Sequence, residues 1–358
     1  MNSKLKQISS LIFIIFLMLI TNYFIFKDQS FETLFEALKE VNPLYILAGL
    51  SMMFIFVGCE ALNTFSIMKA LNQKVTYLKC LGFAFVGFYF SSITPSSSGG
   101  QPAQIFYMNK ANINLSYSSL NVLIITVVYQ LVMMLYGCLL FLVKHQFIVE
   151  NLYGIKYFLI FSVTINTLIT IAILMAMFSK KFIYRLIHFL TDILAKIRLI
   201  KNVESVRSKL ESLVMEYTKS ANYIKTQPLL LLRVVLTTTI QLTAMYLVPY
   251  FVYKAFHLNA YSMIEIISFQ ALVSLAVSSI PLPGAVGASE NAFMSAFKLF
   301  FTSQLLVPAM LLCRGISFYS FLLISGIISL IVHLILTKEK QNSTSRPPKK
   351  FSFPNKKE

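Results

Sequence analysis

Apolar runs long enough to cross a membrane recur along the whole chain, and no other feature limits the possible folds as strongly. They cover residues 8–26, 44–66, 118–143, 156–178, 229–253 and 304–336. The hydrocarbon core of a bilayer needs about 20 apolar residues in an α-helix, and inside lipid only helices and closed barrels satisfy their own backbone hydrogen bonds. The sequence therefore predicts an all-α polytopic membrane protein.

Composition excludes other classes of protein. The chain of 358 residues is 57% apolar and 13% charged, whereas soluble domains carry about 25% charged residues. A soluble enzyme, a disordered chain and a coiled coil are therefore excluded. The net charge of +17 does not indicate a nucleic-acid partner, because the cytoplasmic loops of membrane proteins collect Lys and Arg.

The residues that usually hold metals or cofactors are scattered. Four cysteines lie in apolar surroundings and four histidines share no ligand spacing; they are Cys59, Cys80, Cys138, Cys313, His145, His188, His257 and His333. We therefore expect no disulfide framework, no metal site, no cofactor and no catalytic cluster. The sequence has no GxxxxGK phosphate loop, so we expect no ATP-driven motor.

Two apolar stretches end abruptly in breaks rich in Gly and Pro. Residues 77–93 lead into a break at 94–102, and residues 262–280 lead into a break at 281–290. The two segments align at matching positions: residues 91–93 on 278–280, Gly100 on Gly287 and Phe106 on Phe293. Paired interruptions at corresponding places in two halves are typical of the internal repeats of transporters.

The distribution of basic residues predicts how these segments cross the membrane. If both breaks are re-entrant hairpins, one side holds 23 of the 31 basic residues, in the N-terminus, residues 67–79, Lys110, residues 180–227 and the tail. If the first break crossed fully, the ten basic residues of 180–227 would move outside, against the positive-inside rule. We therefore predict two inverted repeats, residues 1–143 and 156–336, each with three spanning helices and one re-entrant Gly/Pro hairpin. Both termini would be cytoplasmic, in the cell membrane of a bacterium.

Residues 180–227 and 337–358 are polar segments outside the predicted spans. Apolar residues recur at helical spacing in 180–227, which predicts two amphipathic helices at the inner membrane surface or, equally, a solvated helical pair packed on itself. Residues 337–358 hold seven basic residues and three prolines. This composition predicts a disordered cytoplasmic tail that either binds anionic lipid or acts only as a topology anchor.

The two breaks are the predicted site. Irregular backbone cannot face lipid, so both must face protein or a wet cavity. Each break is followed by a helix N-terminus, for which Pro102 suits the first turn and Ser289 is a candidate cap. Two such termini aimed at the membrane midplane would bind an anion such as a lipid phosphate; the alternative is two tight turns that only let helices pack. The candidate residues in the breaks are Pro95, Ser97, Gly99, Gly100, Gln101, Pro283, Gly284 and Gly287.

Three charged residues inside apolar segments complete the candidate site. Arg314 lies about ten residues into the last span, about 15 Å deep at ~1.5 Å per residue, where an unpaired charge is costly. Glu290 is its expected partner, although it would also complement its own helix N-terminus. Glu60 lies roughly two turns from the inner surface and either lines the site or snorkels. Gln104, Asn63 and Gln241 are weaker polar candidates.

The two breaks and the arginine resemble a known family. Residues 94–102 (TPSSSGGQP) and 283–292 (PGAVGASENA), followed by Arg314, are similar to the signature loops and arginine of the lysylphosphatidylglycerol-synthase transmembrane-region family, the flippase-like membrane region of the multiple peptide resistance factor. The resemblance covers roughly residues 5–336. The positions on the family pattern are Pro95, Gly99, Gly100, Pro283, Gly284, Gly287, Glu290 and Arg314. Gln101 stands where an acidic residue is common and Gln104 where a basic one is common, which argues against an ion pair or proton relay at the first loop.

The resemblance implies binding or translocation of a lipid between leaflets, by a flippase-like domain at residues 1–336. The expected partner is the membrane and an anionic phospholipid, such as phosphatidylglycerol or its lysyl form, or a polyprenyl-phosphate-linked precursor. In the full-length family enzyme a soluble C-terminal domain transfers lysine from lysyl-tRNA to phosphatidylglycerol. That domain would have to follow Leu336, where 22 residues remain, so we expect no transferase site.

Two alternative functions and the oligomeric state stay open at this point. One rival is a phosphatidylglycerol lysyltransferase acting alone or with a separate tRNA-dependent subunit, the one case in which nucleic acid would be a partner. The other is a membrane scaffold that transports nothing. Self-association into a homo-oligomer also stays open.

Overall fold

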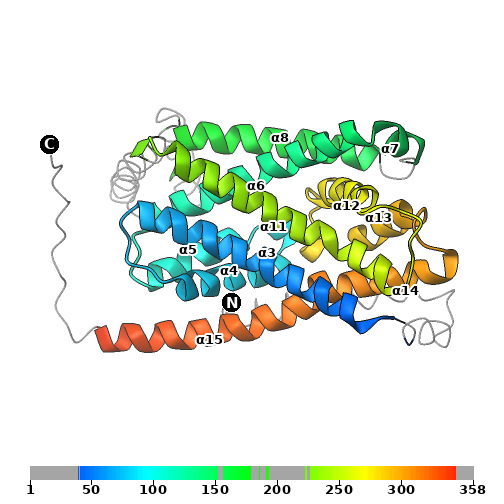
Figure 1. Cartoon of the computed structure of the whole chain (residues 1–358). Helices are drawn as coiled ribbons and strands as arrows, with labels where there is room; N and C mark the ends of the chain where they lie inside the picture. The colour runs from blue at the N-terminus through cyan, green and yellow to red at the C-terminus, as the bar shows by residue number, and fades with distance from the viewer. Residues whose placement is uncertain are drawn as a thin grey trace.

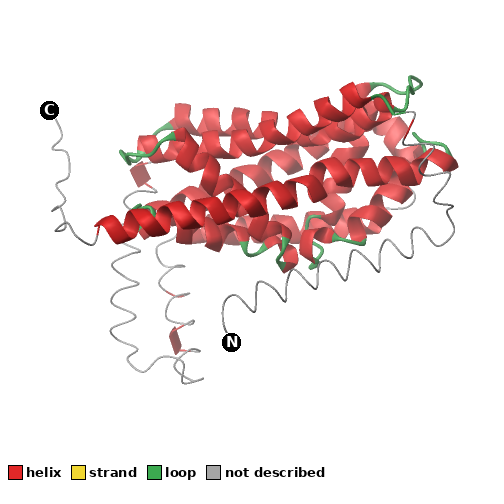
Figure 2. Cartoon of the chain, turned by 90° about the horizontal axis from the view of Figure 1, so that it is seen from below, coloured by secondary structure: helices red, strands yellow, loops and turns green. Residues whose placement is uncertain are grey.

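The computed structural model describes residues 41–151, 156–178 and 226–343, with isolated positions at 39, 185, 191, 192, 222 and 223. Within these residues all regular secondary structure is helical (Figure 2). The expected first span at 8–26, the interior of 180–227 and residues 344–358 lie outside the described residues.

The described chain contains the following helices in order. They are α3 (Pro43–Ala70), α4 (Tyr77–Ser92), α5 (Gly100–Lys110), α6 (Leu115–Val143), α7 (His145–Asn151), α8 (Lys156–Phe178), α11 (Pro228–Ala255), α12 (Met263–Val277), α13 (Ala288–Phe297), α14 (Ser303–Arg314) and α15 (Ser320–Ser343). Two 3-10 turns, η1 (Pro95–Ser97) and η2 (Pro283–Ala285), follow α4 and α12, and a π-helical segment, η3 (Gly315–Tyr319), joins α14 to α15.

Helix starts are set by local capping residues. Asn42 Oδ1 accepts a hydrogen bond from the Leu44 N–H at 3.0 Å, and Pro43 occupies the first position of α3. Ser262 and Glu265 form a reciprocal capping box at the start of α12. Such caps satisfy N–H groups that have no partner within the helix. The apolar runs therefore become helices with defined ends rather than frayed ones.

Four described helical runs have the length and hydropathy to cross a membrane. These are α3, α6, α11 and the continuous run 303–338, while 159–171 and α12 are shorter apolar stretches. Large apolar side chains also cover the outer faces, since Leu139, Ile240 and Leu323 are more than half exposed. A helix that is apolar on all sides is typical of burial in lipid. The chain is a multi-pass membrane protein, and the predicted spans in the described residues are confirmed as helices.

The helices α3 and α11 lie along each other through the middle of the molecule (Figure 1). The Asn42 N–H donates to the Ala255 carbonyl at 3.0 Å, so the start of α3 meets the end of α11 and the two helices run antiparallel. The helices α4, α5 and α15 pack together beside α3, whereas α6, α8 and α12 pack together beside α11. Because α4 follows the end of α3 and α12 follows the end of α11, these two segments begin at opposite ends of the bundle.

Each Gly/Pro break forms a short turn between two helices that pack against each other. The helices α4 and α5 flank η1, α12 and α13 flank η2, and the two turns touch inside the molecule. Positive φ values occur at Ser96 and Ser97 in the first turn and at Gly284 and Ala285 in the second. The turns therefore pair Pro95 with Pro283, and the N-cap positions of α5 and α13 pair Gly99 with Gly287. The sequence overlay of Gly100 on Gly287 was wrong by one residue, because it matched glycines rather than positions in the turn.

The last predicted span is interrupted by η3. Residues 303–343 run on helically, but the five residues after Arg314 adopt π-helical hydrogen bonding, with the Ser320 N–H bonded to the Gly315 carbonyl. The helix also continues to Ser343, beyond Leu336, where the sequence analysis places the start of the tail. Nothing in the hydropathy pattern marks a π segment, because one inserted residue changes hydrogen bonding and not composition.

Candidate functional site

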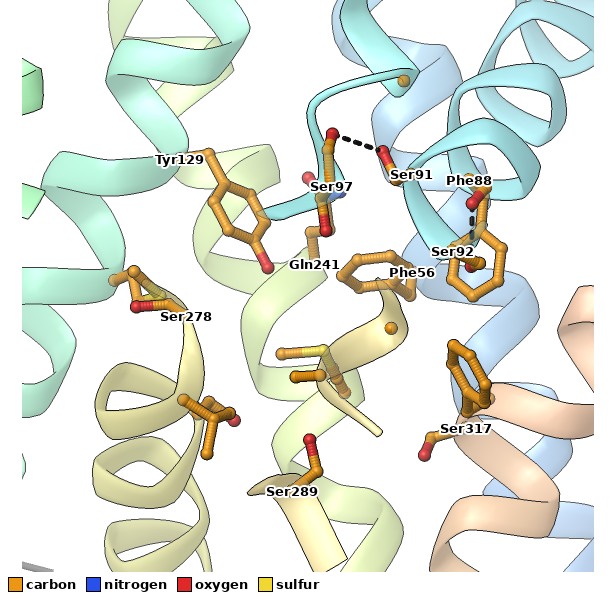
Figure 3. A pocket seen from close by; sticks show the side chains of 18 of the residues that line it. Phe56, Phe88, Ser91, Ser92, Ser97, Tyr129, Gln241, Ser278, Ser289 and Ser317 are labelled. Carbon is orange, nitrogen blue, oxygen red and sulfur yellow. Dashed lines mark hydrogen bonds between the residues drawn. The ribbon is translucent and has the colours of Figure 1, made fainter. Parts of the chain in front are cut away.

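A cavity of about 520 Å³ lies where the two turns meet. Figure 3 shows Ser97 of η1, Ser289 of α13 and Ser317 of η3 around the same space, with Phe56 and Phe88 on one wall. Of the predicted site residues, the cavity is lined by Glu60, Ser97, Gly100, Gln101, Gly284 and Arg314. The others, Pro95, Gly99, Pro283, Gly287 and Glu290, are not among its lining residues. The volume is within the roughly 300–1,000 Å³ typical of small-ligand sites.

The first turn is held tightly against α4. Thr94 Oγ1 accepts a hydrogen bond from the Gly99 N–H at 2.8 Å and donates to the Phe90 carbonyl at 2.6 Å. A Cβ on Gly100 would lie 2.8 Å from the Gly87 carbonyl oxygen and would overlap Ser91. Gly99 and Gly100 therefore let the first turn approach the backbone of α4 closely. The same approach brings Gly100 and Gln101, in the first turn of α5, to the cavity wall.

The second turn is organised by Glu290. Gly287 is the N-cap of α13, with φ of 86°, and its N–H donates to Glu290 Oε2 at 2.6 Å. The expectation that Ser289 caps this helix was wrong: Ser289 lies one position inside the first turn, where it lines the cavity. A carboxylate three residues after the cap position accepts the free N–H instead, as in half of a capping box.

The predicted pair of Glu290 and Arg314 is present. Arg314 Nε donates to Glu290 Oε1 at 2.8 Å, and Glu290 is 1% exposed. The two interpretations of Glu290 hold together, since one carboxylate oxygen accepts the guanidinium and the other caps α13. A buried pair of this kind is strongly destabilised when either partner is removed, by about 3–5 kcal/mol.

Arg314 is oriented by further contacts around the second turn. Its Nη2 donates to the Gly284 carbonyl at 3.2 Å, and its guanidinium carbon lies 4.3 Å from the centre of the Phe318 ring. Guanidinium carries five N–H donors, and these two hydrogen bonds leave donors near the cavity that Arg314 lines. Glu290 is not among the lining residues, so a ligand in the cavity would meet Arg314 and not its carboxylate partner.

Glu60 faces the cavity rather than snorkelling to the surface. Gln241 Nε2 donates a hydrogen bond to Glu60 Oε2 at 3.1 Å, and the side chain of Gln104 lies on the wall of the same cavity. All three residues line the cavity. A Cβ on Gly87 would lie 2.7 Å from the Gln104 carboxamide carbon, so that glycine makes room for the amide. Asn63, in contrast, bonds Thr238 at 3.0 Å and is not a lining residue.

Several polar lining residues were missed by the sequence analysis. They are Tyr129 and Gln130 of α6, Asn166 of α8, and Gln270 and Ser274 of α12. They are single or paired polar residues in apolar helices, and hydropathy does not say which face of the helix they occupy. A weak signal existed in α6, where the lining residues Thr126, Tyr129, Gln130 and Met133 follow helical spacing.

Comparison with known proteins agrees with this architecture. The family described as "Lysylphosphatidylglycerol synthase TM region" matches residues 7–325. A protein named UPF0104 membrane protein PH1989, from Pyrococcus horikoshii, is 23% identical over 311 residues, which are 84% of this chain and 90% of that protein. The family match covers most of the chain, including both turns, Glu290 and Arg314. The chain therefore belongs to the lysylphosphatidylglycerol synthase transmembrane-region family.

Proposed function

We propose that this protein binds an anionic phospholipid, such as phosphatidylglycerol or its lysyl form, or a lipid-linked precursor, and moves it between leaflets. The observation that carries the proposal is the cavity between the two touching turns, with Arg314 on its wall. Guanidinium binds phosphate oxygens well because its planar fork matches their geometry. In this proposal Arg314 and the first turn of α5 bind the head-group phosphate.

The arrangement of the hairpins supports an alternating-access mechanism. A helix of 16 residues such as α4, or 15 residues such as α12, is about 22–24 Å long and falls short of the roughly 30 Å core of a bilayer. Each would therefore turn back inside the membrane. The two begin at opposite ends of the bundle, and α3 and α11 are antiparallel, as two inverted repeats require. Transporters with such repeats bind their substrate where the repeats meet.

Charge supports the orientation. Lys69, Lys74, Lys79 and Lys110 belong to the end at which α4 begins, while Lys144 and Lys254 belong to the opposite end. By the positive-inside rule the α4 end is cytoplasmic. Both termini would then be cytoplasmic, in the cell membrane of a bacterium.

A vesicle assay tests the proposal. The protein is reconstituted into vesicles containing fluorescent phosphatidylglycerol, and dithionite added outside bleaches only the outer leaflet. We expect the inner pool to become bleachable in vesicles with the wild-type protein, and the rate to fall strongly in Arg314→Ala. Arg233→Ala, which changes an exposed arginine near the start of α11, is the matched control and should keep the rate. Equal bleaching in wild-type, Arg314→Ala and protein-free vesicles would contradict translocation.

The family description favours one second candidate, because it names a synthase. A phosphatidylglycerol lysyltransferase would form lysyl-phosphatidylglycerol from lysyl-tRNA and vesicles. We expect no such product from the purified protein alone. Lysine incorporation without another protein would replace the translocator proposal with the synthase, whereas wild-type protein that neither moves lipid nor forms this product would favour a scaffold.

A further inference from the structure

Glu60 is a carboxylate in a membrane-spanning helix without a basic partner in the described part of the chain. No Lys or Arg nitrogen among the described residues lies within 4 Å of it, and its hydrogen-bond partner there is the amide of Gln241. Amides donate hydrogen bonds but supply no positive charge. A charge inside the membrane is costly unless it is compensated. The Arg314–Glu290 pair is neutral by itself, so an ionised Glu60 would leave the described cavity wall with one uncompensated negative charge.

The side-chain amide of Gln241, next to Glu60, has an oxygen without a hydrogen-bond donor among the described residues. Gln241 is 1% exposed and lines the cavity, and its Nε2 is used by Glu60. Its Oε1 is buried and accepts no hydrogen bond from the described residues. A buried acceptor without a partner is unfavourable and calls for a specific explanation. An amide oxygen next to a carboxylate is a pair of ligands that a small cation prefers.

Tyr129 of α6 also lines the cavity, and Figure 3 shows its hydroxyl on the side that faces Gln241. The acceptors therefore come from three helices, α3, α6 and α11, while Gln104 of α5 packs alongside. Convergence of oxygens from separate elements is how a protein builds an ion site rather than a chance polar contact.

We propose that Glu60, Gln241 and Tyr129 form a monovalent-cation site, filled by a proton or by Na⁺. Once the Gln241 amide turns over, a proton on Glu60 makes an O–H that donates to Gln241 Oε1, and Na⁺ would bind the carboxylate and the same amide oxygen. Either cation neutralises the carboxylate and gives the unpaired acceptor a partner. The site lies in the proposed lipid cavity, so its use as a driving ion rests on the proposed function, but the binding itself does not.

The other groups around Glu60 do not offer a competing site. Cys59 precedes it on α3 and is not among the residues that line the cavity. The lining residues of α4 are Ala84, Gly87, Phe88, Ser91 and Ser92, which do not titrate in the usual range. Arg314 also lines the cavity but is held by Glu290. A cation effect that depends on Glu60 is therefore assigned to Glu60 and not to a neighbour.

Thermal unfolding of the purified full chain in detergent tests the site without any lipid transport. The Tm is measured as NaCl replaces N-methylglucamine chloride at constant ionic strength and alkaline pH, and again as the pH is lowered without Na⁺. We expect one of the two cations to raise Tm by roughly 2–4 °C at saturation. Na⁺ dependence at alkaline pH identifies the ion as Na⁺, and dependence on pH alone identifies a proton.

Three variants make the test decisive. Glu60→Gln should abolish the response, and Gln241→Leu, which keeps the carboxylate and removes the amide oxygen, should raise the cation concentration needed by about tenfold. Glu265→Gln, at a carboxylate paired with Lys144 outside the cavity at 2.9 Å, should keep the full response. An undiminished response in Glu60→Gln would overturn the proposal, as would a wild-type Tm that neither cation changes. If Glu60→Gln does not fold, an unchanged midpoint in Gln241→Leu overturns it.

Discussion

At the scale of single residues, Arg314 and Glu290 should behave as one unit. Arg314→Ala leaves a buried carboxylate unpaired, and we expect a loss of about 3–5 kcal/mol in stability, read as a lower Tm and folded yield in size-exclusion chromatography. Arg314→Lys should rescue only part, because Lys lacks the planar fork that reaches both Glu290 and Gly284. The double variant Arg314→Met with Glu290→Gln should recover yield better than either single change. Losses that simply add in the double variant would show that the two side chains do not interact.

The same pair separates stability from transport. If the guanidinium binds phosphate, the double variant should be folded but inactive in the bleaching assay, because no cation remains on the cavity wall. Recovery of lipid movement together with yield would mean that the pair is only structural. That Arg314 lies at the site could be predicted from its depth in the span. The contact between Glu60 and Gln241 could not be predicted, because the two residues are 181 positions apart in sequence.

At the scale of elements, the second turn and η3 offer a matched pair of glycines. Gly284 has φ of 58°, and a Cβ there would overlap the Phe318 ring that packs on Arg314. Ser96 has a similar φ in the first turn, so the ring, and not the dihedral angle alone, is what requires glycine. Gly284→Ala should lower stability by at least about 1–3 kcal/mol and disturb Arg314. A Cβ on Gly315 would have no other atom within 4 Å, so Gly315→Ala should leave the Tm unchanged or slightly raised. Thermal shift in detergent measures both variants, and equal losses of Tm would contradict the role assigned to the Phe318 ring.

Sequence reasoning succeeded for elements whose signal is local. The spans α3, α6 and α11 follow from uninterrupted apolar runs, and the breaks follow from Gly and Pro that cannot continue a helix. It failed where the outcome depends on packing across the molecule. Tyr129 and Asn166 line the cavity because of how α6 and α8 are oriented about their axes, and the two turns correspond by their place before α5 and α13 rather than by matching letters.

At the scale of the whole molecule, the inverted-repeat topology makes a prediction about access from outside. A cysteine introduced in residues 28–40 should react with an impermeant thiol reagent in intact cells, whereas one at position 201 should react only after the membrane is opened. The reason is that 180–227 contains ten basic residues, for which the positive-inside rule predicts the cytoplasmic side. The native cysteines Cys59, Cys80 and Cys313 are buried and Cys138 is exposed on α6, so Cys138 is replaced first. Labelling at position 201 in intact cells would contradict the model of two inverted repeats.

The π segment has a consequence for how this chain tolerates changes in length. An α-helix turns by about 100° per residue, and η3 accommodates one residue more per turn between Arg314 and α15. Ordinary helical pitch over the same five residues would rotate Arg314 by that angle relative to α15, whereas deleting one residue together with the π turn would restore the phase. A deletion of the same size in residues 298–302, before α14, would leave the phase between Arg314 and α15 intact. The direction in which Arg314 points therefore depends on the number of residues between α14 and α15, as well as on which residues they are.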